Sequence, residues 1–164
     1  MARMSVRGTE EYALKLSKLG KNSEAVAGKA IYEAAGIVAD AVKVNLKALP
    51  AVNDVENIKA YRAGRKSQLS IKQKEGLVQA FGITKISNDK GYYNVKLGFD
   101  GYNGIKTKKY PKGQPNQLIA RVVESGSTYM DKTPFVRPAL NASRAEALQK
   151  MQEVIDQEMN KIMK

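Results

Sequence analysis

Histidine and cysteine are both absent from the 164-residue chain, which removes the side chains that most often perform acid–base, thiolate and metal chemistry. Carboxylates remain, but the 16 Asp and Glu residues form no closely spaced set that would hold a metal ion. The chain has neither a phosphate-binding glycine loop nor a Gly-x-Ser-x-Gly motif. We therefore expect no enzymatic activity, no cofactor and no metal ion.

Positive charge is the chemical feature that the sequence supplies in excess. The chain carries 28 Lys and Arg and a formal net charge of +12, which favours anionic partners. Two segments concentrate this charge, at about 51–75 and at about 100–116. The residues that we single out are Arg62, Arg65 and Lys66 in the first segment, and Lys106, Lys108, Lys109 and Lys112 in the second.

Three interpretations of these basic segments stay open. They face the phosphates of DNA without reading its sequence, with the aromatic rings of Tyr102 and Tyr110 nearby. They bind acidic patches on neighbouring proteins. Alternatively, they are solvated surface, as charge runs usually are. The second segment is rich in Gly and Pro, which predicts a long loop, and such loops are uncommon without a function.

The chain before residue 50 is predicted to be helical. Acidic residues after Thr9 favour a helix start, and Gly20 is expected to end that helix. Ser23 then starts a longer helix, which Pro50 must stop. Apolar side chains recur along it at helical spacing beside a face of small residues, which lets a partner approach closely: Ala27, Ala30, Ala34 and Ala41.

The middle of the chain predicts a hairpin. Order is expected to return at Gly76, with a turn of helix that leads into a strand ending near Ile86. Residues 88–91 have the composition of a tight turn. Apolar and polar residues then alternate from Tyr93 to Phe99, which predicts a half-buried return strand.

A last helix is predicted after Thr133, preceded by a short apolar element at 118–123. The order of elements indicates the α+β class: a single domain over residues 1–164, with a small antiparallel sheet packed against a long N-terminal helix and a C-terminal helix. The apolar stripe expected on the last helix is Leu148, Met151, Ile155, Met159 and Ile162.

No segment reads as a membrane span, and the first eight residues lack the apolar core of a secretory signal. We expect a soluble protein that is made in the cytoplasm and makes no membrane contact.

Three features of the sequence carry a resemblance. The stretch Val123-Glu124-Ser125-Gly126-Ser127 precedes Pro134-Phe135-Val136-Arg137-Pro138-Ala139-Leu140. Gly76-Leu77 precedes Gly82-Ile83, and an alanine-rich helix ends at Pro50. Together they resemble the minor tail components of tailed phages, a family found among neck and tail-completion proteins. That family has a Glu-aromatic-Gly-Thr turn before a Pro-Phe-x-Arg-Pro-Ala helix start, and here serines replace its aromatic residue and its Thr.

The resemblance implies a structural virion protein of a tailed phage or phage-like particle, made in the cytoplasm of the host bacterium. Such a protein forms a homo-oligomeric ring, a hexamer or a dodecamer, at the neck or the top of the tail, where it helps to complete the tail and to join it to the head. The implied partners are the head-completion, tail-terminator, tail-tube or tape-measure proteins, and genomic DNA in the channel. The motif residues with structural roles are Glu124, Gly126, Pro134, Phe135, Arg137 and Pro138.

The alternative function is that of a basic nucleic-acid-binding protein outside the virion, without sequence specificity. The charge of +12 permits it, although no recognition module is present.

Elementary chemistry also assigns roles to the motif residues. Phe135 is expected to anchor the start of the last helix in the core. Pro138 suits a helix start, because its fixed φ fits there and its missing N–H costs little. Arg137 either forms an ion pair with Glu124 across the turn or, like Glu124, is solvated.

Overall fold

A single long helix, α1 (Thr9–Ala48), begins the part of the chain that our computed structural model describes, residues 9–89 and 92–163. The predicted break at Gly20 is wrong, because a glycine inside a helix costs only about 1 kcal/mol. Ser23 does not start a new helix either, and its Oγ donates a hydrogen bond to the Gly20 carbonyl at 2.8 Å. The predicted stop at Pro50 is confirmed. Residues 1–8, for which the sequence predicts no secretory signal, lie outside the described residues.

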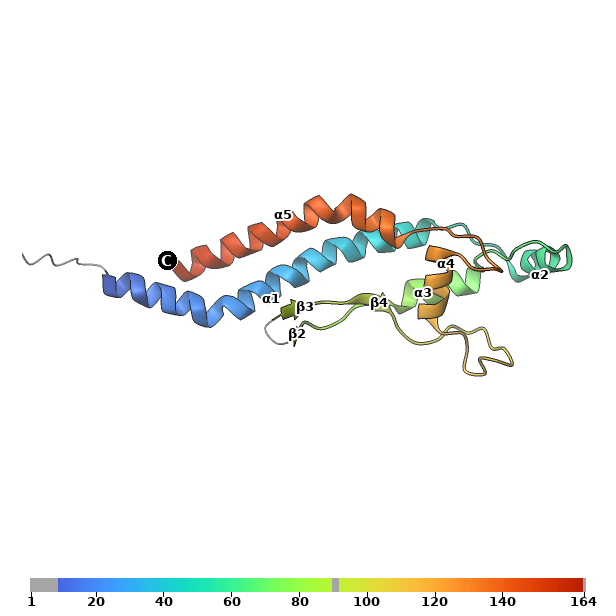
Figure 1. Cartoon of the computed structure of the whole chain (residues 1–164), viewed down its shortest axis with the longest axis horizontal. Coiled ribbons are helices and arrows are strands. Elements are labelled where there is room, and N and C mark those ends of the chain that lie inside the picture. Colours follow the sequence, from blue (N-terminus) through green and yellow to red (C-terminus); the bar gives the residue numbers. More distant parts are fainter. Residues whose placement is uncertain (1–8, 90–91, 164) are drawn as a thin grey trace, which may run out of the picture.

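The last helix, α5 (Val136–Met163), returns antiparallel along α1 (Figure 1). Two ion pairs join the helices, Lys29 to Glu158 at 2.8 Å and Lys150 to Glu33 at 3.5 Å. The ammonium groups of Lys161 and Lys29 lower the pKa of Glu158 to about 2.

Small side chains are buried along this helix pair, as the alanine face of the sequence predicts. The expected stripe of α5 is only partly right, since Leu148 is 56% exposed. The buried side of α5 lies one position before the expected stripe, with Ala147 and Val154 buried. The small residues that are buried are Ala30 and Ala34 of α1, and Ala139, Ser143 and Ala147 of α5.

Two short helices lie where the sequence predicted a basic excursion. Helix α2 (Asp54–Arg62) starts at the cap residue Asn53, whose Oδ1 accepts the Glu56 N–H at 2.9 Å. Helix α3 (Ile71–Ala80) starts at Ser70. Regular secondary structure therefore begins well before Gly76, where the sequence predicted it. The two helices start at local cap residues, which a search for apolar periodicity does not detect.

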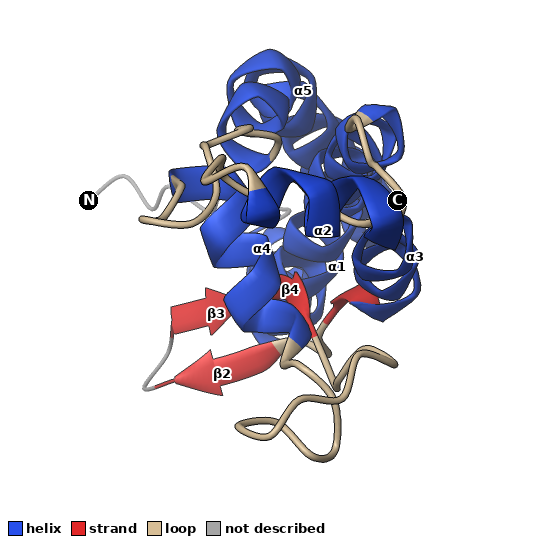
Figure 2. Ribbon diagram, turned by 90° about the vertical axis from the view of Figure 1, so that its right-hand side faces the viewer, coloured by secondary structure: helices blue, strands red, loops and turns tan. Residues whose placement is uncertain are grey.

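Four short strands form two antiparallel pairs: β1 (Phe81–Ile83) with β4 (Leu97–Phe99), and β2 (Ser87–Asp89) with β3 (Tyr92–Asn94). The predicted return strand is thus divided in two. Its alternation is confirmed toward the end, since Phe99 is buried whereas Lys96 and Gly98 are exposed. Figures 1 and 2 show the strands on the side of α1 away from α5. The α+β class is confirmed.

The main core lies where α1 ends, under α3 and α4 (Asn116–Ser125). The three phenylalanines meet there, with ring centroids 5.1 Å apart for Phe81 and Phe99 and 6.0 Å apart for Phe99 and Phe135. Phe135 is fully buried. No described helix combines the length and the apolar character that a membrane crossing needs.

Candidate functional site

The two halves of the motif meet at the start of α5. One carboxylate oxygen of Glu124, Oε2, accepts the N–H groups of Phe135 and Val136 at 2.7 and 2.8 Å. The other, Oε1, accepts the N–H of Arg137 at 3.0 Å. The first turn of a helix has N–H groups without intrahelical partners. Here three of them bind Glu124, and Pro138, next in the chain, has no N–H to satisfy.

The ion pair between Glu124 and Arg137 is not formed, because the carboxylate binds the backbone and not the guanidinium. The alternative of two solvated charges is right for Arg137, which is exposed, and wrong for Glu124. Burial raises the pKa of Glu124, but the N–H groups of Val136, Phe135 and Arg137 and the charge of Arg137 outweigh that effect. The pKa of Glu124 therefore lies below its ordinary value, and the carboxylate also faces the positive end of the helix dipole.

Gly126 and Ser127 shape the turn between the two halves. Gly126 has a φ of +78°, and a Cβ on it would lie 3.1 Å from the Lys132 nitrogen. The Ser127 hydroxyl accepts the N–H groups of Tyr129 and Met130 at 3.2 and 3.1 Å. Pro134, the remaining motif residue, is exposed just before Phe135.

The second basic segment is a loop between β4 and α4, residues 100–115, which we call the lysine loop. Its base is closed by the buried Asn103, whose Oδ1 accepts the N–H groups of Ile105 and Gln114 at 2.9 and 3.1 Å. Gly113 has a φ of +109°, and a Cβ on it would lie only 2.0 Å from the Asn103 carbonyl oxygen. The loop is therefore fixed at its base by hydrogen bonds and by close packing.

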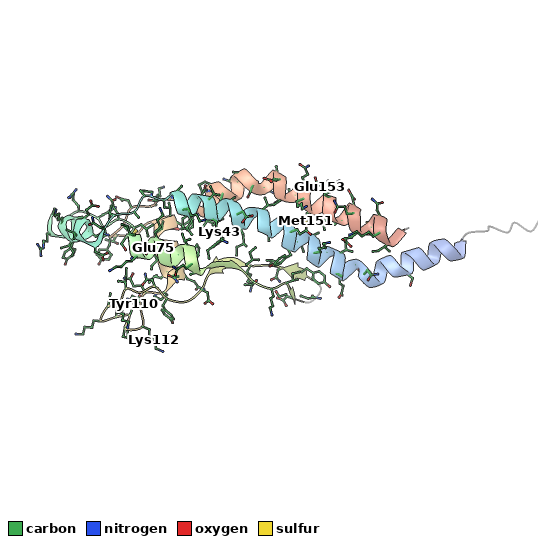
Figure 3. All side chains as sticks on the ribbon, turned by 180° about the vertical axis from the view of Figure 1, so that it is seen from behind. Lys43, Glu75, Tyr110, Lys112, Met151 and Glu153 are labelled. Carbon is green, nitrogen blue, oxygen red and sulfur yellow. The ribbon has the colours of Figure 1, made fainter. Side chains whose placement is uncertain are left out.

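The four lysines that the sequence singled out lie beyond this closed base. Lys106, Lys108, Lys109 and Lys112 are all exposed, and none forms an ion pair within the described chain. The Lys109 ammonium lies 5.6 Å from the centre of the Tyr110 ring. Figure 3 shows Tyr110 and Lys112 on the part of the loop that projects away from the helices.

The first basic set is not uniform. Arg62 ends α2 and Arg65 follows it, and both are exposed. Lys66 is paired, with its Nζ 2.6 Å from Asp131 Oδ1. This set and the lysine loop lie toward the same end of the molecule, but on separate elements (Figures 1 and 3).

Outward-facing residues of α2 were missed by the sequence analysis. Val55, Ile58 and Tyr61 are exposed, as is Tyr129 in the turn before α5. The three-residue spacing after the cap Asn53 was the available signal. Across the parts of the chain that the structure describes, no three acidic side chains come together to hold a metal ion.

No protein-family model, curated protein or solved structure matches the chain.

Proposed function

We propose that this chain is a structural subunit of a tailed-phage virion, which forms a ring at the neck or the top of the tail, helps to complete the tail and joins it to the head. The contact of Glu124 with the N–H groups of residues 135–137 carries this proposal. The two motif halves that resemble the phage family contact each other here, since Glu124 of the first half binds the N–H groups of the second. The resemblance therefore applies to the two halves together and not only to each one separately. No step of catalysis is part of this function.

The extended surface of the chain supports assembly into an oligomer. Its accessible area is 12105 Å², whereas a compact monomer of 18.0 kDa exposes about 8,000 Å². Permanent interfaces bury roughly 2,000 Å² or more in total. A ring subunit has two such contacts, and the long α1–α5 pair offers the area for them.

Electron microscopy of the purified full-length chain tests the proposal. We expect closed rings, hexamers or dodecamers, and the same chain in purified phage particles by mass spectrometry. A chain that stays monomeric at high concentration and is absent from particles would contradict the proposal.

The second candidate is a nucleic-acid-binding protein outside the virion, which the unpaired lysines of the lysine loop favour. It predicts a monomer that binds duplex DNA and is absent from particles. The same two measurements therefore separate the two functions.

A further inference from the structure

Helix α2 lies at one end of the long axis of the molecule (Figure 1), and its large apolar side chains are exposed. Val55, Ile58 and Tyr61 are 58%, 51% and 80% exposed, and no residue of α2 is buried. A surface helix normally turns its apolar side toward the core. On α2 this orientation is reversed.

Polar contacts hold α2 in this orientation. Asn57 exchanges two hydrogen bonds with the backbone of Gln68, accepting its N–H at 2.9 Å and donating to its carbonyl at 3.0 Å. Asp54 pairs with Lys72 at 3.1 Å. The helix is thus attached without its large apolar side chains, which remain free for another contact.

A second exposed aromatic residue and a hollow adjoin α2. Tyr129 is 78% exposed, and its carbonyl accepts the N–H of Ser67, just after α2, at 2.8 Å. An open hollow of about 520 Å³ lies between these segments, with Ala60 as its α2 residue, Leu69 and Met130 among its other apolar lining and Arg65 among its polar lining. The exposed side chains of Val55, Ile58, Tyr61 and Tyr129 do not line it. Tyrosine is enriched at protein interfaces, so the two exposed rings of Tyr61 and Tyr129 are the feature that indicates a docking site.

The charge around this surface is positive. Lys59, Arg62 and Arg65 form no ion pair within the described chain, whereas Lys66 is neutralised by Asp131. Glu56 is the nearby acid of α2 that stays unpaired among the described residues. A second copy of a chain with a net charge of +12 would bring like charge to this surface, so an acidic partner is the complementary one.

We infer that this surface binds an acidic protein. Its anchors are Val55, Ile58, Tyr61 and Tyr129, its rim is Arg62 and Arg65, and we call it the α2 face. The inference rests on the proposed function, which makes the partner a neighbouring neck or tail protein. The inference also gives the two basic segments different roles. Val55 and Ile58 are apolar and cannot bind phosphates, which are contacted by charged and polar groups. The exposed and unpaired lysines of the lysine loop, by contrast, are suited to contact the phosphates of DNA.

Photo-crosslinking in the assembled particle tests this inference. The full-length chain carries p-benzoylphenylalanine in place of Ile58. The matched control carries it in place of Gln152, an exposed residue of α5. We expect position 58 to crosslink to an acidic segment of a different virion protein, and position 152 not to give that product. A product with a second copy, a product with DNA, or no product from particles that contain the chain would overturn the inference and leave the proposed function standing. If particles lack the chain altogether, both fail.

Charge reversal then tests the rim, with the crosslinked protein purified as the probe. The double variant Arg62→Glu and Arg65→Glu should lower affinity for it at least about tenfold, the equivalent of about 1.4 kcal/mol, and make binding less dependent on salt. Replacement of Lys106, Lys108, Lys109 and Lys112 by Gln should leave that affinity unchanged. Equal losses from both variants would overturn the inference, since they would indicate a nonspecific attraction to positive charge.

Discussion

Glu124 takes at the start of α5 the place that a local N-cap residue has in most helices. Its carboxylate reaches the helix from 11 residues earlier in the chain. Because it binds the three N–H groups ahead of Pro138, the end of α4 and the start of α5 are held together by one side chain. Spacing alone indicated a contact near Arg137, but it could not show that the backbone rather than the guanidinium is the partner.

Removing this carboxylate should destabilise the chain. Glu124→Ala is expected to cost about 1–3 kcal/mol, the range for leaving partly buried donors unsatisfied. Glu124→Gln should cost less, since one oxygen remains to accept hydrogen bonds. Urea denaturation measures both, with Glu146→Gln as the control, because Glu146 is exposed on α5. Equal stability of Glu124→Ala and the parent would show that the cap contributes nothing.

The lowered pKa of Glu124 also predicts how stability depends on pH. Its contribution is fully present above the unfolded pKa, near 4.5, and is lost as the pH falls through the lower folded value. Denaturation from about pH 7 to about pH 3 should therefore show the gap between parent and Glu124→Gln shrinking with acid. Glu158 titrates in both proteins, so the comparison isolates Glu124. A gap that is constant with pH would contradict the assignment.

Phe135 was predicted to anchor the last helix, and the structure confirms that it is fully buried against Phe99. Phe135→Ala should therefore cost about 3–5 kcal/mol. Thermal melts should show a fall of roughly 2–4 °C for each kcal/mol. Tyr129→Ala, which removes an exposed ring, is the control and should melt like the parent.

At the level of elements, the sequence predicted those with strong periodicity and missed those that depend on local or distant contacts. The end of α1 before Pro50 could be predicted because proline cannot continue a helix. The alternation before Phe99 could be predicted because a half-buried strand has a two-residue period. The break at Gly20 was predicted wrongly, since the cost of one glycine is small beside that of ending a helix. Helix α2 was missed because it is short and its signal is local, namely the cap Asn53 and the three-residue spacing of Val55, Ile58 and Tyr61.

The base of the lysine loop depends on Gly113. No sequence pattern shows that a glycine is required at this position. Gly113→Ala would place a Cβ 2.0 Å from the Asn103 carbonyl oxygen at a positive φ, so the base should open. Hydrogen exchange should then quicken at the Ile105 and Gln114 amides, which bind Asn103. Gly104→Ala in the same loop is the control, because nothing lies within 4 Å of its Cβ position. Unchanged exchange in Gly113→Ala would contradict the closed base.

At the level of the whole molecule, the sequence located both basic segments but could not tell them apart. Charge runs look alike in sequence, whereas the structure pairs Lys66 with Asp131 and leaves the loop lysines unpaired. The difference arises from folding, because Asp131 reaches Lys66 from 65 residues away.

The lysine loop is expected to bind duplex DNA weakly and without sequence preference. The logarithm of affinity should fall with the logarithm of salt concentration, with a slope of about 0.9 for each phosphate contacted. Replacing Lys106, Lys108, Lys109 and Lys112 by Gln should flatten that slope. A control that makes the same change at Lys43, Lys47, Lys85 and Lys96 loses equal charge elsewhere. Equal flattening by both sets would show that only net charge matters, and absence of binding at low salt would remove the DNA role.

The pairing of α1 with α5 has a consequence for synthesis on the ribosome. Lys29 and its partner Glu158 are 129 residues apart, so at about 5–20 residues per second α1 waits roughly 6–26 s for α5 to be made. Helices form within about a microsecond. During that wait the side of α1 destined for α5 is folded but uncovered, and it is open to other nascent chains or to chaperones. Truncation before Val136 should therefore yield an aggregating fragment rather than a smaller stable domain.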